Sequence, residues 1–181
     1  MEDDRRPKLC AIRRDDPQRA DALLAAVASH LRDHGARVVG VLQQDTVRDG
    51  RRRCDMELVD LRTGTRMAIS RDRGDHARGC RLDEGGMAAA AARIEAQIRD
   101  GADIVIINKF GKAEAEGRGL RDAIAQALLH EIPVLTGISD IATNAFQAFA
   151  GELGAILDTD METIVRWLDL FDQNRPSFIG R

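Results

Sequence analysis

One segment of the chain, residues 108–119, gathers the side chains and glycines that an anion-binding loop needs. It reads NKFGKAEAEGRG and holds two of the chain's three lysines, Lys109 and Lys112. Its glycines let backbone N–H groups approach a ligand closely, and its lysines supply positive charge. Glu114 and Glu116 suit either a bound metal ion or ion pairs with the lysines. The segment predicts an anion-binding loop, and the alternative is a solvated turn held by surface ion pairs.

A second segment, residues 70–81, is rich in arginine and reads SRDRGDHARGCR. Arginine guanidinium groups make two-pronged hydrogen bonds with planar or tetrahedral oxyanions. All but three of the chain's 27 basic residues are arginines, which is typical of a GC-rich genome, so a mobile loop of mixed charge is the alternative. The two segments together give the predicted ligand-binding residues, which are Asn108, Lys109, Phe110, Gly111, Lys112, Glu114, Glu116, Gly117 and Arg118, with Arg71, Arg73, Arg78, Cys80 and Arg81 facing them.

The cysteines and histidines predict neither metal binding nor nucleophilic catalysis. Cys10, Cys54 and Cys80 form no CxxC pair, and such an odd, sparse set does not build a disulfide framework. His76 stands four residues before Cys80, but no fourth ligand completes a zinc site around them. No serine lies in the elbow motif of a hydrolase triad. We therefore expect free thiols, no metal site and no catalytic residue.

Length and composition exclude several classes of function. With 181 residues, of which 44% are apolar, the chain is expected to form one domain, residues 1–181, with a sizeable core. Aromatic residues make up only 3% and the net charge is −3, which argues against a nucleic-acid partner. No apolar run reaches the roughly 20 residues of a membrane span, and residues 1–8 lack the apolar stretch of a signal peptide. We expect a cytoplasmic protein without a membrane partner, and a homodimer as the default assembly.

The first part of the chain predicts a strand–helix–strand unit. Residues 9–12 and 38–42 are short apolar runs typical of buried strands. Between them, Asp16 is a good helix N-cap and Pro17 suits the first helical position, where its missing N–H is not needed. Gly35 predicts the end of this helix. The two strands are expected to lie parallel, with a right-handed crossover.

The middle of the chain predicts an insert at about residues 45–83. Residues 56–61 and 66–69 are strand-like runs separated by a turn, so an antiparallel hairpin is expected. The arginine-rich residues 70–83 should follow as a loop. Residues 173–181 are expected to form a tail.

The second half of the chain returns to an α/β pattern. Residues 104–107 are four consecutive β-branched residues, which is typical of a central parallel strand buried on both faces. Residues 134–136 predict the next strand. The whole pattern predicts a three-layer α/β domain with a parallel sheet. Because ligands in such sheets bind beyond the carboxyl ends of the strands, the candidate loops are 13–20, 108–119 and 137–144.

The order of these elements resembles the thermostable-type nucleoside-triphosphatases of the P-loop class. The likeness covers residues 9–150 and includes DLRTG at 60–64, where that family has a similar DL-x-TG hairpin. It implies a P-loop-NTPase-like parallel sheet with a β-hairpin insert. The family's phosphate loop would fall on residues 13–20, RRDDPQRA, which contain no glycine, lysine or hydroxyl group. The magnesium-binding acids would fall on Asn108 and Lys109, so the Walker motifs are degenerate and hydrolysis of ATP or GTP is not expected.

A second resemblance covers nearly the whole chain. The segments CDM at 54–56, GCRLD at 79–83 and NKFGKAEAEGRGLR at 108–121 look like the signatures of an uncharacterised bacterial family, a domain of unknown function. Members of that family are encoded near genes for molybdate uptake and the molybdenum cofactor. The resemblance therefore implies a role in molybdenum handling.

Three hypotheses of function follow. The first is a non-hydrolysing P-loop-like protein that binds a small anion, either an oxyanion such as molybdate or the phosphate of a nucleotide or pterin, in molybdenum uptake or cofactor handling. The second is a nucleotide-dependent enzyme, an NTPase or kinase, with a rearranged phosphate site. The third is an adaptor or regulatory protein without a small ligand. Lys109 separates these hypotheses, because the first two need it in a cleft and the third favours an ion pair with Glu114.

Overall fold

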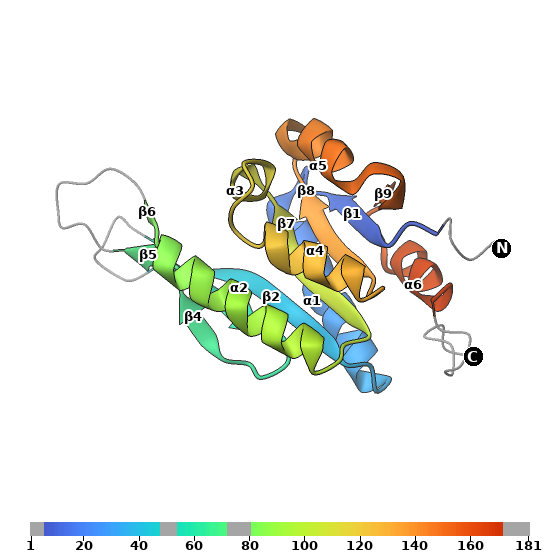
Figure 1. The fold of residues 1–181 in the computed structure, drawn as a ribbon, viewed down its shortest axis with the longest axis horizontal. Helices are drawn as coiled ribbons and strands as arrows, with labels where there is room; N and C mark the ends of the chain where they lie inside the picture. The colour runs from blue at the N-terminus through green and yellow to red at the C-terminus, as the bar shows by residue number, and fades with distance from the viewer. Residues whose placement is uncertain (1–5, 48–53, 72–80, 172–181) are drawn as a thin grey trace.

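The computed structural model describes residues 6–47, 54–71 and 81–171 (Figure 1). Its main feature is a seven-stranded sheet with the order β4-β3-β2-β7-β8-β1-β9. Strands β2, β7, β8, β1 and β9 run parallel, and β3 and β4 continue the sheet as an antiparallel hairpin. The strands are β1 (Leu9–Arg13), β2 (Val38–Val47), β3 (Cys54–Asp60), β4 (Arg66–Ala68), β7 (Ile104–Phe110), β8 (Val134–Ile138) and β9 (Gly154–Leu157).

Helices cover both faces of this sheet and complete three layers. In Figure 1, α2 and α4 lie in front of the sheet and α1 lies behind it. The helices α1 and α6 bury their apolar residues against one face, and α2, α4 and α5 bury theirs against the other. These helices are α1 (Pro17–Asp33), α2 (Glu84–Arg99), α4 (Arg121–Leu129), α5 (Thr143–Ala150) and α6 (Met161–Asp169), and the short ones are α3 (Lys112–Ala115), η2 (Asp140–Ala142) and η3 (Gly151–Leu153). The predicted three-layer α/β architecture is confirmed.

Local sequence signals explain where α1 begins and ends. The Asp16 side chain accepts a hydrogen bond from the backbone N–H of Arg19 at 3.1 Å, and Pro17 is the first helical residue. Gly35 takes a φ of +81°, a left-handed conformation that favours glycine after a helix. The predicted helix and both of its boundary signals are confirmed.

The hairpin insert is continuous with the main sheet. Strand β2 extends to Val47 and pairs with β3 from Val41↔Asp60 to Val47↔Cys54. Beyond β4, the strands β5 (Ser70–Arg71) and β6 (Arg81–Leu82) form a separate two-stranded ribbon. The sequence predicted a loop throughout residues 70–83, and these two short strands correct that prediction.

Strand β7 is longer than predicted. The β-branched run suggested residues 104–107, but the strand continues through Asn108 and Lys109 to Phe110. Phe110 is 1% exposed and belongs to the core, which draws the end of the strand inward. The register of β7 against β8 shifts between Ile107 and Phe110, so an irregular stretch separates the regular strand from its last residue. The predicted loop therefore begins at Gly111 and not at Asn108.

No helix among the described residues is both long enough and apolar enough to cross a membrane.

Candidate functional site

Residues that follow three neighbouring parallel strands meet at the carboxyl edge of the sheet. Arg14, directly after β1, donates its backbone N–H to the carbonyl of Ile138 at the end of β8. The Arg14 side chain reaches further, and its Nη1 donates to the carbonyl oxygen of Asn108 on β7 at 3.0 Å. The candidate loops after β1, β7 and β8 are thus joined by one arginine, as their position at the same edge predicts.

The Arg14 side chain is held in a prepared place. Only 12% of it is exposed, and its two terminal nitrogens donate to the two carboxylate oxygens of Asp21 on α1. A Cβ atom at Gly137 on β8 would lie 2.6 Å from Cδ of Arg14 and 2.7 Å from the Asn108 carbonyl oxygen. Gly137 therefore makes room for the arginine stem. Sequence reasoning placed Arg14 in the candidate loop 13–20 but selected neither Arg14 nor Asp21 as a ligand-binding residue.

The connection from β1 to α1 is short and its helix end is already capped. Three residues, 14–16, separate the strand from the helix. Asp16 brings a carboxylate to the helix N-terminus, and Pro17 has no N–H to offer. A phosphate loop needs glycines, a lysine and several unpaired N–H groups in this position. The residues present do not fit a bound nucleotide phosphate held in that way.

The loop after β7 is organised around the buried carboxylate of Glu114. This side chain is 4% exposed, and its oxygens accept hydrogen bonds from the backbone N–H groups of Gly111 at 2.9 Å and Leu120 at 3.0 Å. Gly119 has a φ of +64°, and a Cβ atom there would overlap the Glu114 carboxylate. Arg121 donates to the Glu114 carbonyl oxygen at 3.0 Å. Glu114 therefore closes the loop from within.

An aromatic cluster packs around Phe110, the residue of β7 that precedes the same loop. The ring of Phe110 packs edge-on against Phe146, with centroids 5.6 Å apart, and stacks on Phe149 at 5.5 Å. The guanidinium of Arg121 lies 4.4 Å from the Phe149 ring centroid, a cation–π contact. Phe110, predicted as a ligand-binding residue, is 1% exposed and packs in the core, where it anchors the end of β7.

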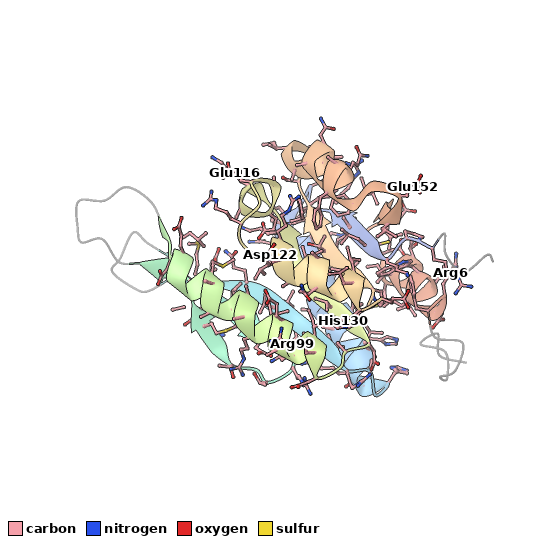
Figure 2. The ribbon with its side chains drawn as sticks, viewed as in Figure 1. Arg6, Arg99, Glu116, Asp122, His130 and Glu152 are labelled. Atoms are coloured by element: carbon pink, nitrogen blue, oxygen red, sulfur yellow. The ribbon has the colours of Figure 1, made fainter. Side chains whose placement is uncertain are left out.

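The outer charges of the loop pair with each other on the surface. Lys112 lies 3.7 Å from Glu116, and Arg118 pairs with both Glu116 and Glu84. The hydrogen bond from Arg118, aided by Lys112, lowers the pKa of Glu116 below its usual range. Figure 2 shows Glu116 on the outer side of α3. The ion-paired surface that the alternative interpretation expected is present for these residues, and it lies beside Gly117, whose φ is +81°.

Lys109 differs from these paired residues. It is exposed, and no described carboxylate lies within ion-pair distance of its ammonium group. Its stem passes over Gly111, where a Cβ atom would lie 3.9 Å from Cδ and Cε of Lys109. The Glu114 carboxylate is turned inward instead, where its two oxygens accept backbone hydrogen bonds from Gly111 and Leu120. Asn108, its neighbour, is buried with 4% exposure.

The structure does not describe the side chains of the ligand-binding residues predicted in the arginine-rich segment 70–81. Arg73, Arg78 and Cys80 lie outside the described residues, as do the side chains of Arg71 and Arg81. Arg118 of the first segment pairs at 3.3 Å with Glu84, which begins α2 just beyond the arginine-rich segment.

Cys10 lies in an environment that disfavours reactions of its thiol group. This side chain is 0% exposed in β1, and burial raises its pKa to about 12. A thiol in that environment is not ionised near neutral pH and is a poor nucleophile. Among the residues with described side chains, no three or more histidines, cysteines or carboxylates cluster as a metal site would require.

The sheet order and the helices on both faces give the fold of the P-loop-NTPase-like α/β class. A solved structure titled "Crystal Structure of THEP1 from the hyperthermophile Aquifex aeolicus" matches with a TM-score of 0.56 and 16% sequence identity, covering 96% of this chain and 98% of that one. At this identity the likeness concerns the fold alone, and it confirms the predicted fold class.

The chain belongs to the family described as "Protein of unknown function (DUF2478)", whose model matches residues 9–167. A curated relative, "Molybdenum import ATP-binding protein ModC 2" of Bradyrhizobium diazoefficiens, is 37% identical over 148 residues. The matched stretch is 81% of this chain but only 16% of that protein. The chain is thus similar to one part of a much longer protein, and the predicted family resemblance is confirmed.

Proposed function

We propose that this protein binds a small oxyanion without hydrolysing a nucleotide, and that it works in the cytoplasm in molybdenum uptake or molybdenum-cofactor handling. The observation that carries the proposal is that the charged residues at the carboxyl edge are paired at one strand end and exposed at another. Arg14 and Asp21 occupy the strand end where a phosphate loop would begin, whereas the exposed Lys109 on β7 has no described acid partner.

The absence of hydrolysis follows from the chemistry of the β1–α1 connection. Phosphoryl transfer needs a lysine on the transferred phosphate and an oxygen ligand for magnesium. Here the connection supplies two carboxylates, Asp15 and Asp16, which would repel a polyphosphate. On β7, Lys109 stands where a magnesium-binding acid would be expected, and an ammonium group does not bind a cation.

The ligand class follows from what the second loop offers. Lys109 is a point charge at the end of a central strand, on a loop that Glu114 and the phenylalanine cluster hold in one shape. Such a rigid support reduces the entropy lost when a small anion binds. Molybdate, phosphate and sulfate share the tetrahedral dianion form, and the phosphate groups of nucleotides and of phosphorylated pterins are tetrahedral anions as well. The relative's name, which refers to molybdenum import, makes molybdate the first ligand to test.

A panel of ligands tests this proposal on the purified full chain. Molybdate, tungstate, sulfate and phosphate are compared with magnesium ATP and magnesium GTP by melting temperature, and phosphate release is followed with both nucleotides. A ligand at 100 times its Kd adds about 2.7 kcal/mol, which raises the melting temperature of a domain this size by roughly 5–10 °C. We expect that rise with molybdate and tungstate, and no phosphate release. A rise with magnesium nucleotide alone, accompanied by turnover, would instead establish the nucleotide-dependent enzyme.

A second candidate function has its own observation. Because the matching stretch forms 16% of a longer ATP-binding protein, this domain also suits the role of an adaptor that regulates such a protein without a ligand of its own. No rise in melting temperature with any member of the panel favours the adaptor, and a rise with the tetrahedral oxyanions argues against it.

A further inference from the structure

The pair formed by Arg14 and Asp21 is the most buried ion pair at the carboxyl edge among the described residues, and the predicted ligand-binding residues do not include it. The guanidinium makes a two-pronged contact with the carboxylate, the geometry with which arginine also holds phosphate and similar oxyanions. We propose that Arg14 is a second oxyanion-binding residue and that Asp21 is the internal anion that competes with the ligand for it. This deepens the proposed function, on which it rests for the class of ligand.

The surroundings of Arg14 are those of a prepared cation site. Its side chain is 12% exposed, its backbone N–H is bonded to Ile138, and its stem passes through the space that Gly137 leaves. Its guanidinium also holds the Asn108 carbonyl, which belongs to the peptide that leads into Lys109. Arg14 is thus bonded to the carbonyl oxygen of the peptide group whose nitrogen belongs to Lys109, and a small tetrahedral anion is the class of ligand that two such cations suit.

Asp21 is the more mobile half of this pair by its position. Its side chain is 34% exposed, nearly three times the exposed fraction of the Arg14 side chain, and among the described residues its carboxylate bonds to Arg14 alone. Rotation of Asp21 toward solvent would leave the guanidinium fork open, with Arg14 still held by the Asn108 carbonyl. An anion that binds Arg14 must compete with the closed pair, so its apparent affinity is reduced by the fraction of molecules that are open.

The neighbouring pair of Arg13 and Asp140 provides a matched control. It lies at the same edge, with a nitrogen–oxygen distance of 3.1 Å, but both side chains are exposed, at 47% and 80%. Neutralising either aspartate removes one negative charge from the edge. A general electrostatic gain in anion affinity would therefore appear equally in both variants, whereas the release of a prepared arginine would appear in only one.

The test is a titration of wild type, Asp21→Asn and Asp140→Asn with molybdate and with phosphate by calorimetry. If a tenth of wild-type molecules are open, Asp21→Asn should bind the anion about tenfold more tightly, and Asp140→Asn should bind like wild type. An equal affinity in wild type and Asp21→Asn overturns the competition by Asp21 but leaves the proposed function intact. Tight binding by Asp21→Asn alone supports the competition and contradicts anion binding by the wild-type protein. The absence of binding in all three overturns both.

A second variant keeps the inference testable if Asp21→Asn does not fold. Arg14→Lys retains the positive charge and the attraction to Asp21 but loses the two-pronged geometry. It should weaken anion binding at least severalfold while its melting temperature without ligand stays near that of wild type. Unchanged anion affinity in Arg14→Lys would remove Arg14 from the site.

Discussion

Two buried carboxylates lie at different turns of the chain and are bonded in different ways. At the turn from β3 to β4, Asp60 is 1% exposed and accepts hydrogen bonds from Arg93, Gln97 and the backbone N–H groups of Arg62 and Thr63. In the loop after β7, Glu114 is 4% exposed and accepts only two backbone N–H groups. Both acids close a loop, but only the first also pairs with a cation.

A buried carboxylate that closes a loop therefore has a different effect on the nearest cation in each place. The guanidinium of Arg93 is engaged by several acceptors. It donates to Asp60 and also to the hydroxyl oxygens of Thr63 and Thr65. At Glu114 the backbone alone satisfies the carboxylate, and Lys109 beside it keeps its charge exposed. We interpret the Asp60 contacts as a closed network that stabilises the fold and the loop around Glu114 as a rigid support for a binding cation. The following predictions test that contrast, from the largest expected effect to the smallest.

The largest effect on stability is expected from Asp60→Asn. The amide keeps the shape of the side chain but loses its negative charge, so Arg93 loses its ion pair. One oxygen also becomes an NH₂ group, which cannot accept the hydrogen bonds that this oxygen received. Loss of such a charged, hydrogen-bonded group costs about 3 kcal/mol, which can be measured by urea unfolding. The response to molybdate should be unchanged relative to wild type. A loss of that response would show that the Asp60 and Glu114 regions are coupled and would break the contrast.

A smaller loss of stability is expected from Glu114→Gln. The amide retains one acceptor oxygen, but its NH₂ group faces one of the two backbone N–H groups, from Gly111 or Leu120. One lost hydrogen bond and one unsatisfied donor cost roughly 2 kcal/mol. Here the response to molybdate should fall together with stability, because the loop that carries Lys109 loosens. A variant that is destabilised yet binds the anion normally would separate Glu114 from the site.

The third effect concerns pH and acts through Asp60. Burial raises the pKa of this carboxyl group, but the hydrogen bonds from Arg93, Thr63, Gln97 and Arg62 outweigh burial and hold the pKa below its usual range. A lowered pKa stabilises the folded state above the unfolded value of about 3.9 and ceases to do so as pH falls through the folded value. The difference in melting temperature between wild type and Asp60→Asn should therefore be constant above about pH 5 and shrink in stronger acid. A difference that stays constant down to pH 3 would contradict this assignment.

The sequence predicted the framework of the fold better than its polar contacts. The Asp16–Pro17 start of α1 and the β-branched run of β7 are local signals, and both were confirmed because neighbouring residues decide them. Phe110 was assigned to a loop because a lone phenylalanine among glycines and charges gives no sign of the two distant phenylalanines on which it packs.

The polar contacts of the candidate site depend on the folded chain. The two acids of the loop 111–119 look alike in sequence. The backbone turns Glu114 inward, where it accepts backbone hydrogen bonds, and leaves Glu116 on the surface, where it pairs with Lys112. The Arg14–Asp21 pair joins a strand end to the second turn of a helix and touches β7 as well. Such a contact requires the sheet order, which no local pattern contains.

The most direct test of the central claim is a calorimetric titration of molybdate into wild type, Lys109→Ala and Lys8→Ala. Lys8 is the matched control, because it is the one lysine outside the loop and pairs with Glu131 at 3.2 Å near the amino end of β1. The claim predicts that Lys109→Ala loses most of the binding, that Lys8→Ala binds like wild type, and that the ligand-free melting temperatures of all three agree closely. Equal binding by Lys109→Ala and wild type would contradict the claim that this strand end holds the anion.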